Sequence, residues 1–234
     1  MVTLRVIHRA LLVTAAVLLV APVATLSAMY LIGPSSVPAP VLPLSDVPEL
    51  PRNALWVALG ERRGETQDPV WRSLFWNGQS NSAPRGALAV SELARLWRLE
   101  HRTMPLRMWE WHIEGAALTV WLRRHATAAQ MQQALAEWEY FGREARGIRA
   151  ASIAYFGTTP ESLSNAQVAL LAGLPAAPTF YDPFCHPERA QKRRAYVLSR
   201  MQASGLISDV QVEQANSEAL QVRPPVQPCP NSPR

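Results

Sequence analysis

The spacing of apolar residues along the chain predicts a protein built from α-helices. The segment 87–100 is the clearest case, because its apolar side chains fall on one helical stripe: Leu88, Leu93, Leu96 and Trp97. Further helices are predicted over 53–63, 70–76, 106–124, 127–140, 147–156 and 187–204, and after the capping boxes at Ser164 and Ser208. No segment shows the alternating pattern that is typical of a β-strand. The predicted fold class is therefore all-α.

A longer apolar run near the N-terminus predicts a membrane anchor. Between Arg9 and Asp46 the chain carries no charged residue, and residues 10–32 consist mainly of Ala, Val and Leu. About 20 apolar residues span a bilayer core as a helix. Arg5 and Arg9 precede the run, and the positive-inside rule keeps residues 1–9 in the cytoplasm. We therefore expect a single-pass protein of the inner membrane whose soluble domain lies in the periplasm.

A cleaved signal peptide is the alternative explanation of this run, because Ser27-Ala28 offers small residues at a cleavage position. The uninterrupted apolar length favours the anchor, and so does Leu26 at the minus-three position. Both explanations place the domain outside the cytoplasm.

Proline marks the two ends of the predicted domain. Six prolines lie between Pro34 and Pro51, so residues 33–51 are predicted to form an extended, semi-rigid linker. Residues 52–217 follow as one domain, which suits their length. Residues 218–234 form a second proline-rich segment, a C-terminal tail.

The charge of the chain favours anionic ligands. The formal net charge is +5, and Lys192 is the only lysine, so nearly all the positive charge comes from arginine. The planar guanidinium donates two parallel hydrogen bonds to a phosphate or carboxylate. On a membrane-tethered domain this indicates lipid headgroups or a phosphate-bearing ligand, and no nucleic acid is predicted as a partner. A scattered, arginine-rich surface without a ligand is the alternative explanation.

The two cysteines, Cys185 and Cys229, could form a disulfide outside the cytoplasm. The bond would close a loop of about 44 residues and tie the tail to the segment before the helix predicted at 187–204. The sequence contains no Cys-x-x-Cys pair and no His/Cys cluster at metal-ligand spacing, so its motifs predict no metal site.

The most specific pattern lies in residues 138–215, where short runs rich in glycine, aromatic residues and proline follow one another. These runs are Tyr140-Phe141-Gly142-Arg143, Gly147-Ile148-Arg149-Ala150-Ala151, Tyr155-Phe156-Gly157, Ala169-Leu170-Leu171-Ala172-Gly173-Leu174-Pro175, Tyr181-Asp182-Pro183 and Pro187-Glu188-Arg189-Ala190. They closely resemble the C-terminal part of the glycosyltransferase family 51 domain, the peptidoglycan transglycosylase that polymerises lipid II. The single predicted anchor, with no transpeptidase domain after it, resembles the monofunctional members of that family.

The resemblance implies a lysozyme-like α-helical fold on the outer face of the membrane. In the family, a glutamate acts as general base on the 4-hydroxyl of the acceptor sugar, and that oxygen displaces the lipid pyrophosphate at C1 with inversion. Basic residues stabilise the pyrophosphate, in some members with a divalent metal. The implied partners are lipid II, nascent glycan strands and other cell-wall synthesis proteins. The implied substrate-binding residues are Arg95, Arg143, Gly147, Arg149 and Tyr155.

The N-terminal half departs from the family pattern, and the implied catalytic glutamates depend on the alignment register. In the first motif, one register places Glu61 at the general base; another places Gly60 there and Glu61 at the following aspartate. In the second motif, residues 86–93 lack nearly all of the family's hydroxyl and amide side chains. The glutamate of the third motif corresponds to Glu110 or Glu114, which are four residues apart and share a helix face.

Two hypotheses follow. The first is an active, divergent transglycosylase that uses Glu61 as base and Glu110 or Glu114 as the second acidic group. The second is a non-catalytic relative, a pseudoenzyme that binds lipid II or serves as a scaffold in the cell-wall machinery. The replaced motif residues favour the second, since loss of a positioned base alone lowers a rate by about 10²–10⁴-fold. A lysozyme-like, glycan-cleaving activity is a third hypothesis, and it requires two carboxylates flanking a sugar site.

Overall fold

The computed structural model of the chain describes residues 40–43, 46–60, 87–101, 107–226 and 229. Within these ranges the chain forms helices and no β-strand, which confirms the all-α class; an isolated antiparallel bridge joins Tyr140 to Arg146. The predicted anchor at 10–32, residues 33–39 and 44–45 of the predicted linker and the helix predicted at 70–76 lie outside these ranges. In the described part of the chain, no helix combines the length and apolar character that a membrane span requires.

The helices follow the apolar periodicity closely from residue 87 onwards. They are α2 (Glu49–Ala58), α4 (Ala87–His101), α5 (Met108–His125), α6 (Ala128–Trp138), α7 (Ile148–Phe156), α8 (Asn165–Gly173), α9 (Pro187–Ala203) and α10 (Asp209–Ser217). Short 3-10 helices, η3 (Pro160–Ser162) and η4 (Leu174–Ala176), flank α8.

The first described helix begins earlier than its apolar pattern suggested. α2 starts at Glu49, within the segment whose proline content predicted a linker up to residue 51. Pro48 precedes the helix and Pro51 lies in its first turn. The first backbone N–H groups of a helix have no intrahelical acceptor, so a proline there removes no hydrogen bond. Proline content alone therefore placed the end of the linker too late.

Side-chain caps fix the starts of several helices. Ser164 accepts a hydrogen bond from the backbone N–H of Gln167 at 3.2 Å, and Ser208 accepts one from that of Gln211 at 3.4 Å. Both are the capping boxes predicted from the sequence, and each satisfies amides that the first helical turn leaves without partners. Thr127 caps α6 in the same way.

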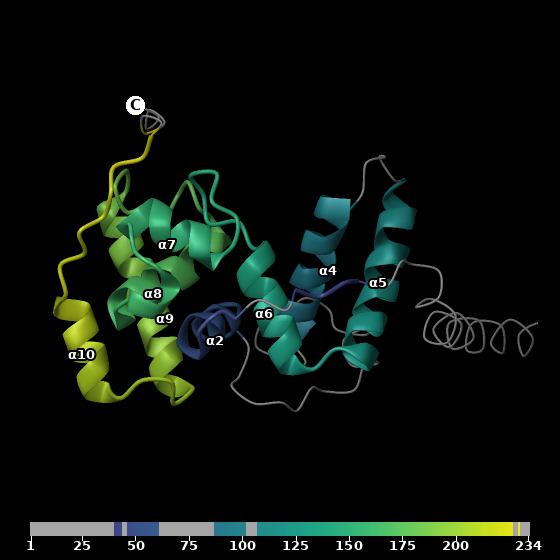
Figure 1. The fold of residues 1–234 in the computed structure, drawn as a ribbon, viewed down its shortest axis with the longest axis horizontal. Helices are drawn as coiled ribbons and strands as arrows, with labels where there is room; N and C mark the ends of the chain where they lie inside the picture. The colour runs from purple at the N-terminus through teal and green to yellow at the C-terminus, as the bar shows by residue number, and fades with distance from the viewer. Residues whose placement is uncertain (1–39, 44–45, 61–86, 102–106, 227–228, 230–234) are drawn as a thin grey trace, which may run out of the picture.

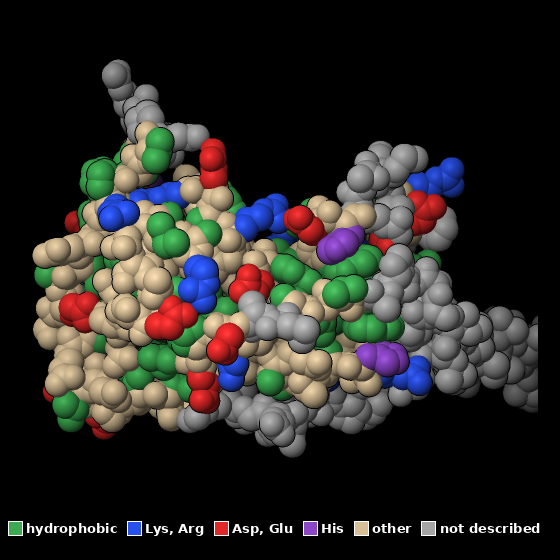
Figure 2. Space-filling model, in the orientation of Figure 1, with side chains coloured by type: hydrophobic (Ala, Val, Ile, Leu, Met, Phe, Trp, Pro, Cys, Tyr) green, Lys and Arg blue, Asp and Glu red, His purple; other side chains and the backbone are tan. Residues whose placement is uncertain are grey.

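Figure 1 shows α4 and α5 at one end of the molecule, α7 to α10 at the other, and α2 and α6 between them. α2 contacts α6, α8 and α9, and α4 contacts α5 and α6, so one hydrophobic core runs through both ends. The face seen in Figure 2 carries acidic and basic side chains interspersed with apolar ones. The net positive charge is therefore not concentrated on that face.

The turn between α6 and α7 has an unusual backbone that its glycines and hydrogen bonds support. Arg143 and Glu144 both adopt positive φ, at 50° and 58°. The amide of Ala145 donates to the carbonyl of Gly142 at 2.8 Å, and that of Gly147 donates to the carbonyl of Glu139 at 2.9 Å. Non-glycine residues in the left-handed region cost free energy, so the surrounding contacts must hold the turn.

The proline-rich tail is fixed to the domain rather than running free of it. The amide of Arg223 donates to the carbonyl of Tyr155 at 2.9 Å. Arg194 donates to the carbonyl of Glu218 at 3.1 Å. The structure also contains the disulfide that the sequence allowed, between Cys185 and Cys229, with the two Cα atoms 5.5 Å apart.

Candidate active site

A charged cluster forms where α4 packs against α6 and the turn that follows it. Glu92 and Arg95 stand three residues apart on α4, so they lie on the same helix face. The Nε atom of Arg95 donates to both carboxylate oxygens of Glu92, at 3.1 and 2.9 Å. Glu139, the residue after α6, interacts electrostatically with both of them. We call Glu92, Arg95 and Glu139 the α4 charged cluster.

Glu139 is the unusual member of this cluster because it is a buried carboxyl group. It is only 3% exposed, and its Oε1 accepts a hydrogen bond from the backbone N–H of Tyr140 at 3.1 Å. The pKa of Glu139 is raised to about 7, chiefly by burial and also by the negative charge of Glu92, while the Tyr140 amide and Arg95 act in the opposite direction. A carboxyl group that titrates near neutral pH can both hold and release a proton there.

Glu92 and Arg95 remain accessible to a ligand. Their side chains are 22% and 45% exposed. Hydrogen bonding to Glu92 raises the pKa of Arg95 against the opposing effect of burial, and the guanidinium is charged. The α4 charged cluster thus offers an accessible carboxylate, an accessible guanidinium and a buried carboxyl group near its titration point. Such groups can move a proton and bind an anion at one place.

The two glutamates predicted on α5 have structural contacts. Glu110 lies in the first turn of α5, and its Oε2 accepts a hydrogen bond from the backbone N–H of Arg107 at 2.9 Å, closing a capping box. Glu114 is 6% exposed and interacts electrostatically with Arg98. The Arg98 guanidinium itself lies 3.7 Å from the ring centroid of Trp111 and ties α4 to α5. Both glutamates therefore have contacts with other residues of the chain.

Glu61, the base predicted from the first motif, lies outside the described residues.

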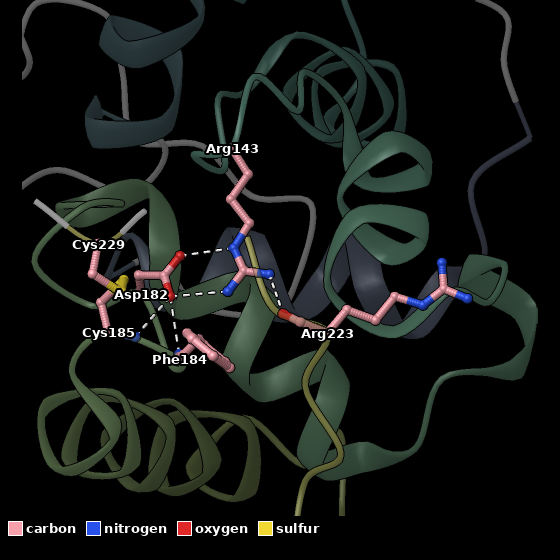
Figure 3. Close-up of a disulfide and its surroundings, with 6 residues drawn as sticks. All are labelled: Arg143, Asp182, Phe184, Cys185, Arg223 and Cys229. Atoms are coloured by element: carbon pink, nitrogen blue, oxygen red, sulfur yellow. Dashed lines mark hydrogen bonds and ion pairs between the residues drawn. A yellow bond between two sulfur atoms is a disulfide. The ribbon is translucent and has the colours of Figure 1, made fainter. Parts of the chain in front are cut away.

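Arg143 and Tyr155, two of the predicted substrate-binding residues, lie together at the other end of the molecule. The Arg143 guanidinium sits 4.2 Å from the ring centroid of Tyr155. The Tyr155 hydroxyl donates to the carbonyl of Phe141 at 2.8 Å, and burial raises the pKa of this hydroxyl. Figure 3 shows the Arg143 guanidinium turned toward Asp182, to which Nε and Nη2 donate at 2.8 and 2.9 Å.

Arg143 and Asp182 border a cavity of about 520 Å³. The tail forms one of its walls through Pro224, Pro225 and Val226. Burial alone would raise the pKa of Asp182, but hydrogen bonds from Arg143 and from the backbone amides of Cys185 and Phe184 lower it below its usual value. Because the Arg143 and Asp182 charges satisfy each other, we regard this pair as a structural link beside the cavity.

The remaining predicted binding residues do not join either group. Gly147 adopts φ +78°, and a Cβ there would meet the carbonyl oxygen of Glu137 at 2.9 Å, so its role is to let two backbones approach. Arg149 forms an exposed ion pair with Glu161 at 3.0 Å. Arg95 alone of the five lies in the α4 charged cluster.

Glu92 and Glu139 were not among the site residues predicted from the sequence. Glu92 stands in the second motif, directly before the Leu93-Ala94-Arg95 run. Its place in that motif is the sequence feature that could have identified it. No sequence pattern could have identified Glu139 as a site residue, because its burial depends on the packing of α4 against α6. Among the described residues, no group of three or more His, Cys, Asp or Glu side chains could hold a metal ion, and we derive no step through a metal.

Comparison with known proteins adds an independent finding. The sequence model of the family described as Transglycosylase matches residues 64–202. Penicillin-binding protein 1A of Aquifex aeolicus is 37% identical over 139 residues, which cover 59% of this chain and 18% of that protein. Penicillin-binding protein 1A of Streptococcus pneumoniae is 36% identical over 155 residues, 66% of this chain and 21% of that protein. The chain thus spans about a fifth of the length of these relatives.

A solved structure is also similar to part of the chain. The crystal structure of penicillin-binding protein 1A from Haemophilus influenzae aligns with a TM-score of 0.43 and 20% sequence identity. The alignment covers 78% of this chain and 18% of that one. At this TM-score we base no argument on it.

Proposed function

Because the chain belongs to the transglycosylase family, we propose that it binds lipid II and transfers its disaccharide to a growing glycan strand in cell-wall synthesis. The α4 charged cluster is the observation that carries this proposal. It joins Glu92 and Arg95, which stand in and directly after the segment of the family's second motif, to the carboxyl group of Glu139 after α6. Sugar transfer from a pyrophosphate needs a proton acceptor and a cation for the leaving group, and these side chains supply both.

In the proposed reaction, the 4-hydroxyl of the acceptor sugar gives its proton to a glutamate while its oxygen bonds to C1 of the donor. The bond between C1 and the pyrophosphate oxygen breaks, and the lipid pyrophosphate leaves as an anion. Glu61 is the base that the family resemblance implies. Arg95, whose guanidinium is half exposed, pairs with the departing pyrophosphate through parallel hydrogen bonds.

We assign the second acidic role to Glu92. Its carboxylate is accessible and already bound to Arg95, whereas Glu110 caps a helix and Glu114 is buried near Arg98. Glu139 acts as a positioning residue behind Glu92. In its protonated form it adds no negative charge beside the leaving pyrophosphate, so its burial favours anion binding.

The proposed location follows from the same substrate. Lipid II is anchored in a bilayer, and an anchor at residues 10–32 would hold the domain next to that surface. We therefore propose an inner-membrane protein with a periplasmic domain that works alongside other cell-wall synthesis proteins.

A non-catalytic function is the second candidate, and one observation favours it. Both glutamates predicted on α5 have contacts within the fold, Glu110 in a helix cap and Glu114 beside Arg98, and these contacts are compatible with purely structural roles. In this case the α4 charged cluster binds the pyrophosphate of lipid II without transferring the sugar.

The full-length chain, purified and mixed with fluorescent lipid II, separates the two candidates. We expect glycan polymer on a gel, and a loss of about 10²–10⁴-fold in rate for Glu61→Gln and for Glu92→Gln. Glu100→Gln, which alters an exposed ion pair with Arg146, is the matched control and should keep the parent rate. Polymerisation that survives both active-site substitutions would overturn the assignment of these residues.

Binding of the same lipid decides the remaining outcomes. If no polymer forms but the chain retains lipid II and Arg95→Gln weakens that retention, the non-catalytic candidate is supported. A chain that neither polymerises nor retains lipid II contradicts both candidates.

A further inference from the structure

One flank of α9 carries cations and half-exposed aromatic rings. The opposite side of this helix packs into the core through Ala190, Val197, Leu198 and Met201. At 100° per residue, Arg189, Lys192 and Tyr196 fall on the side turned away from those residues. Arg193 lies at the edge of that side, where its Nε donates to the carbonyl of Gly173 at 3.0 Å. The loop before α9 adds Phe180 and Tyr181. We call these six residues the α9 basic–aromatic face.

Contacts between rings and guanidinium groups hold this face together. The Cζ atom of Arg189 lies 4.2 Å from the ring centroid of Phe180. The Cζ atom of Arg193 lies 5.0 Å from the ring centroid of Tyr196 and 5.6 Å from that of Tyr181. The two arginines are therefore positioned over the rings rather than extended into solvent.

Two of these rings are nevertheless left uncovered by the described residues, whereas Tyr181 is partly buried against the core. Phe180 is 48% exposed and Tyr196 is 45% exposed. Single exposed apolar residues are ordinary, but large rings gathered with cations mark interaction surfaces. A merely solvated helix flank would be expected to carry short polar and charged residues of both signs.

The charge of the face is positive. Arg189, Lys192 and Arg193 stand on it, and Glu188 is the acidic residue of the same helix at its edge. Asp182 is close in sequence, but its carboxylate is bonded to Arg143 and to two backbone amides. The face therefore attracts anions and repels cations.

We propose that the α9 basic–aromatic face binds the surface of a bilayer that contains anionic lipids. Guanidinium groups bind lipid phosphates in pairs of hydrogen bonds, and aromatic rings settle at the level of the headgroups. A helix flank also suits a flat lipid surface better than a protein partner, whose anchor residues usually fill pockets. Binding of a bilayer surface is a property separate from sugar transfer, and the proposal holds even if the chain transfers no sugar.

The size of the effect can be estimated from the charges. Each basic residue close to an anionic surface increases partitioning about fivefold, and salt screens this contribution. The three cations together would give about 100-fold, which is enough to dock a domain that a tether already keeps near the bilayer.

Lys192 offers a direct measurement, because it is the only lysine of the chain. The full chain is reconstituted into vesicles of phosphatidylcholine alone or with phosphatidylglycerol and treated with a water-soluble acetylating reagent. Mass spectrometry then gives the rate of acetylation at Lys192. We expect at least a fivefold slower rate in the anionic vesicles at low salt and recovery of the rate at high salt.

Variants separate docking from mere proximity to a charged membrane. Arg189→Gln combined with Phe180→Ala should restore fast acetylation of Lys192, since it weakens the face but leaves the rest of the chain unchanged. Arg146→Gln removes one exposed cation that pairs with Glu100 and should keep the protection.

Three results would overturn the proposal. The rates could be equal in neutral and anionic vesicles, as expected for a surface that binds a protein. The double variant could stay as protected as the parent chain. Inorganic phosphate could protect Lys192 without vesicles, which would identify a soluble-anion site in place of a lipid surface.

Discussion

Asp182 accepts two hydrogen bonds from the guanidinium of Arg143, from Nε at 2.8 Å and from Nη2 at 2.9 Å, across 39 residues of sequence. The remaining nitrogen of Arg143, Nη1, donates to the backbone carbonyl of Arg223 in the tail at 2.6 Å. Figure 3 shows this arrangement beside the disulfide between Cys185 and Cys229. A single arginine thus connects the turn after α6, the loop before α9 and the C-terminal tail.

Breaking this pair should destabilise the domain strongly. The side chains of Arg143 and Asp182 are only 8% and 10% exposed, so Asp182→Asn leaves a guanidinium with little water around it. We expect a loss of about 3 kcal/mol in the free energy of unfolding, measured by urea denaturation. Arg143→Met combined with Asp182→Leu should recover part of the loss. A decrease below about 0.5 kcal/mol for Asp182→Asn would contradict the structural role of the pair.

The disulfide should stabilise the domain mainly through the unfolded chain. The bond closes a loop with a sequence separation of 44 residues. In the chain-entropy model this is worth about 4 kcal/mol, so Cys185→Ser with Cys229→Ser should lower the unfolding free energy by about that amount. A reducing agent should lower the parent to the same value and leave the double variant unchanged. Equal stability of the oxidised parent and the double variant would show that the tail adds no constraint.

The stability of the domain should depend on pH through Glu139. Its pKa is about 7 in the folded chain, against 4.5 for an ordinary glutamate, so between these values the folded state binds more protons than the unfolded state. Stability contributed by this group is therefore highest below about pH 4.5 and falls as the pH rises to about 7.

The variant Glu139→Gln should remove this dependence. We expect it to be more stable than the parent at pH 8, by an amount of the order of 3 kcal/mol, and to lose the advantage at pH 4. Urea unfolding at several pH values measures the difference. Glu100→Gln, an exposed residue, serves as the control and should leave the pH profile unchanged. A parallel profile for Glu139→Gln and the parent would show that the pKa of Glu139 is the same in the folded and the unfolded chain.

Two glycines provide a matched pair for the effect of a close backbone approach. Gly147 and Gly205 both adopt positive φ, at 78° and 67°. A Cβ at Gly147 would lie 2.9 Å from the carbonyl oxygen of Glu137, whereas a Cβ at Gly205 would meet nothing within 4 Å. We expect Gly205→Ala to lower the unfolding free energy by about 1 kcal/mol and Gly147→Ala by about 3 kcal/mol. Equal losses would mean that the turn can shift to admit the methyl group.

The sequence by itself determined the helices from residue 87 onwards and the capped starts of α8 and α10. Periodic apolar residues span only a few helical turns, and the caps at Ser164 and Ser208 join residues three apart, so each signal is local. The family could also be inferred, because its motifs lie in order between residues 138 and 215. With two cysteines in the chain, a single intramolecular pairing was available, and the structure contains it.

Only the tertiary structure decided which charged groups meet. Glu139 lies next to a recognised motif, yet its raised pKa comes from the packing of α4 against α6, which brings Glu92 to it across more than 40 residues. Glu110 and Glu114 share a helix face in the sequence pattern, but one caps the helix and the other is buried near Arg98. Burial and charge partners depend on contacts between distant segments, and a local pattern carries no information about them.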